Sequence, residues 1–302
     1  MAIRLMCSLA CTALFLGDGL FLRQVVCADN ALVRGRVMLP TVVSATAADD
    51  RPVKVKDAAF TAAKLKWEVS VPSPNPESML QRFVEECVQI SKGSLKVSRS
   101  KIDAILPDKI VVHRDYRICR FETTQELYRL VMGVNPSRWT GPRNSVERVS
   151  YFDAVQFCKK LTDILRDRDL ITEAQTVRLP SDAEWEYACR AKTTTKYCFG
   201  DSATGASQDA SIDDYAWHSG NAAGNDPSVG KLKPNRWMLA DVHGYLWEFT
   251  QATSGDIEGR SSRVRIWGGS WRASSLDCGS SSIRQVSSTE KAADLGFRCV
   301  IQ

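Results

Sequence analysis

The sequence feature that most constrains the fold is a pair of glycines between two tryptophans near the C-terminus. Residues 267–271 are Trp-Gly-Gly-Ser-Trp, and the chain continues to Leu-Gly-Phe-Arg-Cys at residues 295–299. Only glycine lets a backbone approach another group without a clash from Cβ. The pattern therefore predicts a backbone that passes close to another group beside an aromatic wall. That wall belongs either to a bulged strand in a β-rich core or to an active site.

The N-terminus has the features of an export signal. Arg4 precedes an apolar run over residues 5–16, which is too short to span a bilayer. Val26 and Ala28 occupy the positions before the expected cleavage site that a signal peptidase recognises. We therefore expect a signal peptide over residues 1–28 and a secreted or periplasmic mature protein without a transmembrane domain. An uncleaved anchor remains an open alternative.

Export makes the cysteines informative, because disulfides are the default fate of thiols in an oxidising compartment. Removal of residues 1–28 leaves an odd number of cysteines, so at least one thiol stays free or pairs with another chain. None of them forms a C-x-x-C pair of the kind that binds zinc. The remaining cysteines are Cys87, Cys119, Cys158, Cys189, Cys198, Cys278 and Cys299.

Charge and histidine content exclude several classes of function. The formal net charge is +5, and the basic residues are scattered rather than grouped, so nucleic acid is not an expected partner. The three histidines, His113, His218 and His243, lack the spacing of a two-histidine helical metal site. No glycine-rich phosphate loop or nucleophile elbow occurs.

Residues 29–106 are expected to form an N-terminal extension with one amphipathic helix near residues 76–91. Asn75 is a helix cap and Pro76 suits the first turn. An apolar stripe at helical spacing follows, and it favours docking on the next domain. The stripe consists of Leu80, Phe83, Val84, Cys87 and Val88.

From about residue 107 the pattern predicts short elements and long loops. Residues 123–126 have the sequence of a capping box for a helix that ends at Gly133, and helices are also expected to start at Ser150 and Ser181. Beyond residue 191 the chain is mostly Gly, Ser, Asn, Asp and Trp. We expect such a region to be held together by loops, aromatic side chains and bound ions.

Several blocks over residues 107–302 resemble the formylglycine-generating enzyme, or sulfatase-modifying factor, family and follow its order. The resemblance implies an α+β, C-type-lectin-like fold that is rich in loops, with short helices and small twisted antiparallel sheets. The blocks are residues 121–124 with 133–137, 149–158, 178–190, 197–201 and 241–249, together with the two C-terminal stretches.

In this family the resemblance implies a pair of copper-binding cysteines that convert a sulfatase cysteine to formylglycine with oxygen. Soft thiolates suit Cu(I). Here the second cysteine corresponds to Cys278, but the first corresponds to Ala273, which has no ligand atom. Ser270 corresponds to a serine near the oxygen site; alternatively, its hydroxyl satisfies a bulged strand. Cys278 and Ser270 are thus the candidate catalytic residues.

The resemblance also implies a disulfide and a structural Ca²⁺ site. Cys158 and Cys299 correspond to one family disulfide, whereas the partner position of Cys189 is Gln285. Pairing of Cys278 with Cys189 or Cys198 stays open. The implied calcium ligands are Asp241, Gly244, Leu246 and Glu248, where hard oxygen ligands suit the ion. The alternative is that the two carboxylates simply face water.

Two classes of function follow from these residues. The first is a non-oxidase binding or accessory module, a pseudoenzyme. Its ligand would be an exported protein such as a sulfatase, a peptide or a glycan. Its cleft would be lined by Trp217, Trp247, Trp267 and Trp271. The alternative is a sulfatase-maturing oxidase whose copper ligation is altered, with Cys198 as a replacement ligand.

Overall fold

The computed structural model describes residues 25–26, 32–33, 75–99, 106–201, 211–222, 226–252 and 262–302. The chain divides into two units, Met1–Glu68 and Val69–Gln302. In the first unit, β1 (Val25–Val26) pairs with β2 (Leu32–Val33) in antiparallel fashion. Apart from Val25–Val26, the expected signal peptide lies outside the described residues. Among the described residues, no helix has the length and apolar character needed to cross a bilayer.

The second unit begins with α1 (Pro76–Glu85), which is shorter than the expected helix over 76–91. The Asn75 side chain caps its start, as the sequence predicts. The helix ends at Glu85, and the next residues form β3 (Cys87–Ile90), which pairs with β6 (Tyr116–Cys119). Sheet pairing with a distant strand thus overrides the local helical spacing. The unit therefore extends N-terminal to the expected boundary at residue 107.

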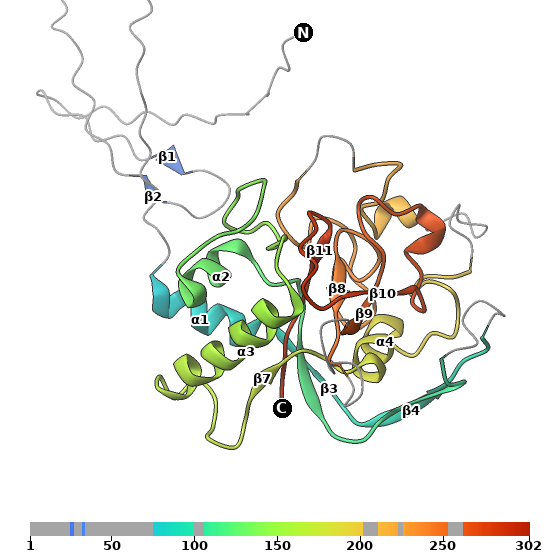
Figure 1. Cartoon of the computed structure of the whole chain (residues 1–302), viewed down its shortest axis with the longest axis horizontal. Helices are drawn as coiled ribbons and strands as arrows, with labels where there is room; N and C mark the ends of the chain where they lie inside the picture. The colour runs from blue at the N-terminus through green and yellow to red at the C-terminus, as the bar shows by residue number, and fades with distance from the viewer. Residues whose placement is uncertain are drawn as a thin grey trace, which may run out of the picture. The chain divides into compact units, whose positions relative to one another are not determined.

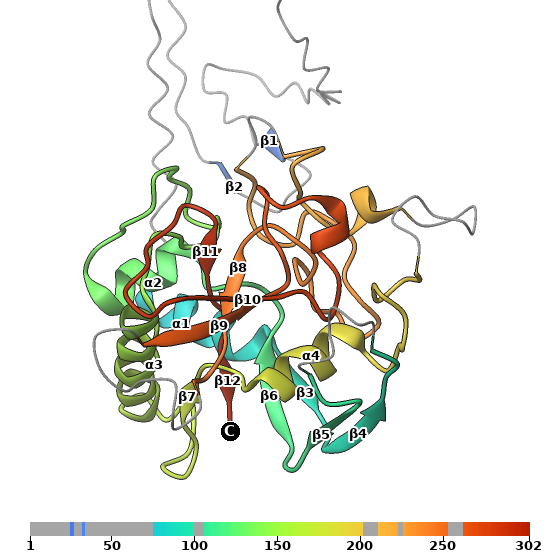
Figure 2. The ribbon, with the colours of Figure 1, turned by 45° about the vertical axis from the view of Figure 1, so that its right-hand side comes forward.

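Two small sheets organise this unit (Figures 1 and 2). The first has the order β3-β6-β12-β7 and is antiparallel, with β7 at Val177–Arg178 and β12 at Val300–Ile301. Beside it, β4 (Gly93–Lys96) and β5 (Lys109–Val112) form a two-stranded ribbon.

The second sheet has the order β10-β9-β8-β11. Its strands are β8 (Trp247–Phe249), β9 (Arg263–Trp267), β10 (Ile283–Ser287) and β11 (Leu295–Gly296). β11 runs parallel to β8, whereas the other pairs are antiparallel. The C-terminal stretch thus contributes a strand to each sheet, through β11 and β12.

Three further helices start near the residues that the sequence indicates. They are α2 (Gln125–Met132), α3 (Tyr151–Arg166) and α4 (Asp182–Arg190). Ser150 and Ser181 form complete capping boxes. The box expected for α2 is not formed, because the carbonyls of Asn144 and Pro142 accept from the first helical N–H groups instead. Among the described residues there are also two short 3₁₀ turns, Ile212–Asp214 and Ser275–Asp277.

The main core lies where α1, α2 and α3 meet the C-terminal stretch. Tyr128 of α2 stacks on Phe157 of α3, and both rings contact Phe297. In a second core cluster, Trp185 of α4 packs against Trp267 of β9. The expected α+β fold, with short helices, small sheets and extensive loops, is confirmed.

Candidate functional site

The glycine pair of the closing stretch makes the close approach that its sequence predicts. Gly268 and Gly269 have φ angles of 97° and 86°. A Cβ on Gly269 would lie 2.7 Å from Cys278 Sγ and 2.7 Å from the Asp277 carbonyl oxygen. Gly269 therefore lets the backbone pass directly against the Cys278 side chain.

Cys278 lies in a sealed, protein-lined position. It is 0% exposed, and its thiol donates to the Ser274 carbonyl oxygen at 3.4 Å. Burial raises the pKa of Cys278 to about 12. The raised pKa disfavours the thiolate, which is the form that acts as a nucleophile or as a metal ligand.

The residues around Cys278 do not fit a copper ion. Ala273, at the position of the first family cysteine, is also buried and carries only a methyl group. Ser270 is fully buried, and its hydroxyl donates to Asp294 Oδ2 at 2.9 Å while accepting from the Arg272 N–H. Ser270 therefore serves as a hydrogen-bonding group within the loop.

His243 joins two loops at this place. Its Nε2 accepts from the Cys198 N–H at 3.1 Å, and its Nδ1 lies 2.8 Å from the Cys278 carbonyl oxygen, to which it donates. Burial lowers the pKa of His243 to about 4, so the ring is neutral. Burial also raises the pKa of Cys198 to about 12, which disfavours the thiolate form that a replacement ligand needs.

A second buried polar site lies where the calcium ligands were expected. Arg298 is fully buried and holds both oxygens of Glu248, at 2.6 Å and 2.8 Å. Trp185 Nε1 also donates to Glu248, at 2.9 Å. Contact with Glu248 raises the pKa of Arg298 against the opposing effect of burial. Arg298 and Glu248 therefore form a buried ion pair in which both carboxylate oxygens accept hydrogen bonds from the guanidinium.

Two more buried carboxyl groups surround Arg298. Glu122 accepts from the Leu246 N–H at 3.1 Å and from the Ser145 hydroxyl, and burial raises its pKa well above the usual range. Asp241 accepts from the Gly230 N–H at 2.7 Å, and burial raises its pKa to about 6. The other oxygen of Asp241 is buried without a hydrogen-bond partner. We call Glu122, Asp241, Glu248 and Arg298 the carboxylate cluster.

Arg298 contacts both Glu248 oxygens that the expected calcium site would use. Both oxygens of Glu248 are held by a guanidinium, whose positive charge would repel a second cation at the same place. Tyr245 occupies the position where the family usually has Asn, and its hydroxyl donates a hydrogen bond to the Pro227 carbonyl oxygen at 2.6 Å. In the part of the chain that the structure describes, no group of three or more His, Cys, Asp or Glu side chains is arranged to hold a metal. Calcium binding by Asp241, Gly244, Leu246 and Glu248 stays a prediction, and the ion pair between Arg298 and Glu248 counts against it.

All seven described cysteines are free thiols. The expected partners Cys158 and Cys299 are neighbours, with their sulfurs 3.7 Å apart, but they are not bonded. A second pair, which sequence reasoning missed, is Cys87 and Cys119, with sulfurs 3.1 Å apart.

The four expected cleft tryptophans do not form one exposed wall. Trp247 and Trp267 are core residues, because they lie on the buried faces of β8 and β9. Trp217 is partly buried, and its indole nitrogen is enclosed without a partner. Of the four, we assign only Trp271 to an aromatic surface.

That surface pairs Trp271 with Trp139, whose rings meet edge to face at 5.7 Å. Arg272 lies over Trp271 at 4.6 Å, and Arg138 lies over Trp139 at 4.7 Å. Trp139 is 38% exposed. We call Arg138, Trp139, Trp271 and Arg272 the aromatic–arginine face.

A buried glutamine, Gln125, positions the loop that carries Trp139. Its amide donates to the Trp139 carbonyl at 2.8 Å and accepts from the Asn135 side chain and the Gly141 N–H. The face is therefore attached to a fixed loop. Sequence reasoning missed Glu122, Arg298 and Trp139, although a charged residue inside an apolar block such as 295–299 is a usable signal of a buried ion pair.

Residues 72–302 match the family described as the sulfatase-modifying factor enzyme 1-like domain. Among curated proteins, the chaperone protein LppX of Paenibacillus barcinonensis is 33% identical over 129 residues, which cover 34% of this chain and 45% of that protein. The chain thus spans less than half the length of this relative.

Solved structures share the fold. Treponema denticola variable protein 1 has a TM-score of 0.58 at 25% identity and covers 71% of this chain and 94% of its own. PvdO from Pseudomonas aeruginosa has a TM-score of 0.57 at 20% identity, with 72% and 94% covered. CarF has a TM-score of 0.52 at 18% identity, with 71% and 97% covered.

Proposed function

The chain belongs to the sulfatase-modifying factor enzyme 1-like family, and from this premise we propose that it is an exported, non-oxidase accessory module that binds a polypeptide partner. The observation that carries the proposal is the state of Cys278. Its thiol is 0% exposed, its pKa is raised to about 12, and the position of its family partner is Ala273. Copper-dependent oxidation of a substrate thiol uses soft thiolate ligands, so the methyl group of Ala273 and the buried thiol of Cys278 support the proposal that this chemistry is absent.

The aromatic–arginine face supports the binding role. Trp and Arg are the residues that most often dominate protein–protein binding energy, because they combine large apolar area with polar atoms. The aromatic–arginine face contains two tryptophans and two arginines, and Gln125 holds the loop that carries Arg138 and Trp139. The two guanidinium groups favour a partner segment that carries acidic side chains next to apolar or aromatic ones.

The relative LppX is named a chaperone protein, which agrees with a role in binding other polypeptides. The relative is matched over only 45% of its length, so its name supports the class of activity and not a particular client.

The copper alternative is tested with a peptide that carries the cysteine motif of a sulfatase. The protein is incubated with Cu(I), oxygen and this peptide, and mass spectrometry looks for the aldehyde, with a family member that carries both cysteines as positive control. We expect no aldehyde. Its formation, and its loss in Cys278→Ser, would replace the proposal with an oxidase that uses altered ligation.

The binding role is tested by suppression of the aggregation of heat-unfolded citrate synthase. We expect suppression by the wild-type protein and its loss in the double variant Trp139→Ala, Trp271→Ala. The matched control is Phe152→Ala, which removes an aromatic side chain that is 46% exposed on α3, outside the face. A second variant, Arg138→Glu with Arg272→Glu, keeps both rings and reverses the charge. Equal suppression by all variants, or retention of the chain on a glycan array instead, would contradict the proposal.

The export component is tested by the N-terminus of the mature protein. Expression of the full chain with its native leader is expected to yield an exported product that starts at Asp29, as Edman sequencing would show. Retention of the full-length chain in the membrane fraction would favour an uncleaved anchor.

A further inference from the structure

Cys87 and Cys119 face each other at the edge of the first sheet. β3 is an edge strand of that sheet, and its register with β6 places Cys87 directly opposite Cys119. Their sulfurs lie 3.1 Å apart. We propose that Cys87 and Cys119 are a disulfide-forming pair that cross-links β3 to β6 by exchange with a disulfide-bearing reactant. The inference does not depend on the proposed function.

The backbone geometry at this pair suits a cross-link. Arg120 N–H donates to the Glu86 carbonyl at 2.9 Å, whereas Cys119 N–H donates away from β3, to the Cys299 carbonyl at 2.9 Å. Cys87 and Cys119 are therefore a non-hydrogen-bonded pair, the kind in which opposite side chains approach most closely. A bond of about 2.05 Å requires the sulfurs to move together by about 1 Å, which side-chain rotation can supply.

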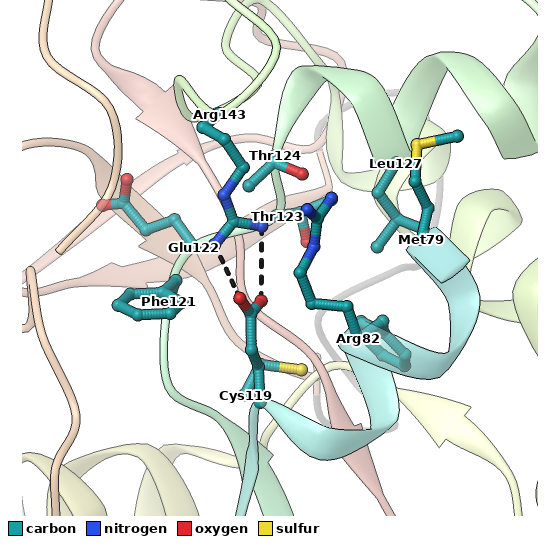
Figure 3. A pocket seen from close by; sticks show the side chains of 11 residues that line it. Met79, Arg82, Cys119, Phe121, Glu122, Thr123, Thr124, Leu127 and Arg143 are labelled. Atoms are coloured by element: carbon teal, nitrogen blue, oxygen red, sulfur yellow. Dashed lines mark hydrogen bonds and ion pairs between the residues drawn. The ribbon is translucent and has the colours of Figure 1, made fainter. Parts of the chain in front are cut away.

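The two thiols differ in access, and this sets the order of reaction. Cys87 is half-buried on the edge strand, whereas Cys119 is buried. Figure 3 shows Cys119 in the lining of a cavity of about 20 Å³, with Arg82 and Arg143 nearby. That volume holds about one water molecule and no larger reactant. A reactant must therefore reach Cys87 first, from the outer edge.

The chemistry is an ordinary two-step exchange. The Cys87 thiolate attacks a sulfur of the reactant disulfide, forms a mixed disulfide and releases the first thiolate. The Cys119 thiolate then attacks Cys87 Sγ, closes the cross-link and releases the second thiolate. The two protein thiols lose two electrons, the reactant disulfide gains them, and the two protons pass to the released thiolates.

Burial raises the pKa of both thiols, although the nearby Arg117 acts in the opposite direction on Cys87. Exchange needs a thiolate, so closure is expected to accelerate about tenfold for each pH unit between pH 7 and 9.

The cross-link would replace weak attachments with a covalent one. α1 is held to the domain partly by ion pairs of half-buried side chains, Arg82 with Glu126 and Arg143 with Glu86. Solvent still reaches these side chains and screens the pairs, so each pair stabilises the attachment only modestly. A bond between Cys87 and Cys119 closes a segment whose ends are 32 residues apart and fixes the end of α1 to the sheet.

The test uses the full mature chain, refolded from the reduced state with oxidised glutathione at pH 8 and digested without reduction. We expect a peptide pair joined between Cys87 and Cys119 whose mass is lower by two hydrogens than the sum of its parts. Oxidised protein is expected to melt roughly 10 °C above reduced protein. Cys87→Ser and Cys119→Ser should each abolish that part of the shift, while Cys278→Ser should keep it.

Two results would overturn the inference. One is a peptide pair that joins Cys119 to Cys299, whose backbones are hydrogen-bonded to each other. The other is full alkylation of Cys87 by iodoacetamide after the oxidised wild-type protein has been unfolded. Because both measurements are made on the wild-type chain, they stand even if a serine variant fails to fold.

Discussion

Two buried sites correspond to positions where the family resemblance implies a metal, and they differ in the charge of the groups that this chain places there. In the carboxylate cluster, Arg298 supplies a positive charge to Glu248 and lies near Glu122 and Asp241. In the closing loop, Cys278 has no second thiol, and Ala273 offers only a methyl group. The first site contains an internal cation, whereas the second contains a neutral thiol.

The difference shows how the charge of a buried group determines what it needs. A carboxylate that loses its partner in the interior is strongly destabilising, because its desolvation is no longer compensated. A thiol avoids this cost by staying protonated and then behaves as a small apolar side chain. The closing loop therefore tolerates the loss of one cysteine, and the cluster would not tolerate the loss of Arg298.

The largest effect is expected for Arg298→Ala. The change leaves three buried carboxyl groups without their cation, and we expect it to lower the free energy of unfolding by roughly 4 kcal/mol at pH 7. The matched control is Arg168→Ala, which breaks the exposed pair with Glu77 and should cost less than about 1 kcal/mol. Urea denaturation measures both, and similar losses for the two variants would contradict the comparison.

The next largest effect is the pH dependence that Asp241 gives to the free energy of unfolding. Its pKa is raised from 3.8 to about 6 in the folded state, so the folded protein binds more protons than the unfolded one between these values, and ionisation destabilises it as the pH rises. Removing the carboxylate with Asp241→Asn should remove this penalty. The stability of the variant relative to wild type should rise by roughly 2 kcal/mol from pH 3.8 to pH 6.

The variant must be compared with wild type at each pH, because His243 acts with the opposite sign. Its pKa is lowered from 6.5 to about 4, so it destabilises the fold as the pH falls through this range. The two contributions offset each other in the wild-type protein. Denaturation of both proteins at matched pH values isolates the Asp241 contribution, and a difference that does not change with pH would contradict its assigned pKa.

A smaller effect is expected for Cys278→Ser. The hydroxyl has nearly the same shape as the thiol and can donate to the same Ser274 carbonyl, so we expect a loss of about 1 kcal/mol. Equilibrium denaturation measures it. A loss as large as that of Arg298→Ala would mean that Cys278 has a charged or bonded partner after all.

The smallest effect is expected for calcium. Since Arg298 already holds both oxygens of Glu248, millimolar Ca²⁺ added to chelator-treated protein should not change the melting temperature. A melting temperature that rises with the logarithm of the calcium concentration would show that the ion binds the folded state. It would also remove the main difference between the two sites.

Much of the fold could be predicted because its signals are local. Asn75, Ser150 and Ser181 cap their helices within two or three residues along the chain. The glycine pair likewise indicated a close approach, since the need for a missing Cβ is visible in the residue itself. The ordered blocks indicated the family over most of the second unit.

The candidate sites were harder to predict because their partners are distant in sequence. Arg298 and Glu248 are 50 residues apart, and nothing local shows that they meet. The helix expected over residues 76–91 ends at Glu85 because Cys87–Ile90 pairs with a strand about thirty residues later. The capping box at residues 123–126 is replaced by carbonyls from the loop around Asn144.

The sequence by itself thus determined where helices start, where the backbone needs glycine, and that the Ala273 position lacks a metal ligand. Only the tertiary structure decided that Cys278 is sealed and protonated, that a guanidinium lies among the expected calcium ligands, and that Cys87 faces Cys119. The physical reason is that capping and backbone conformation depend on neighbouring residues. Burial, pKa and ion pairing depend on which distant segments the folded chain brings together.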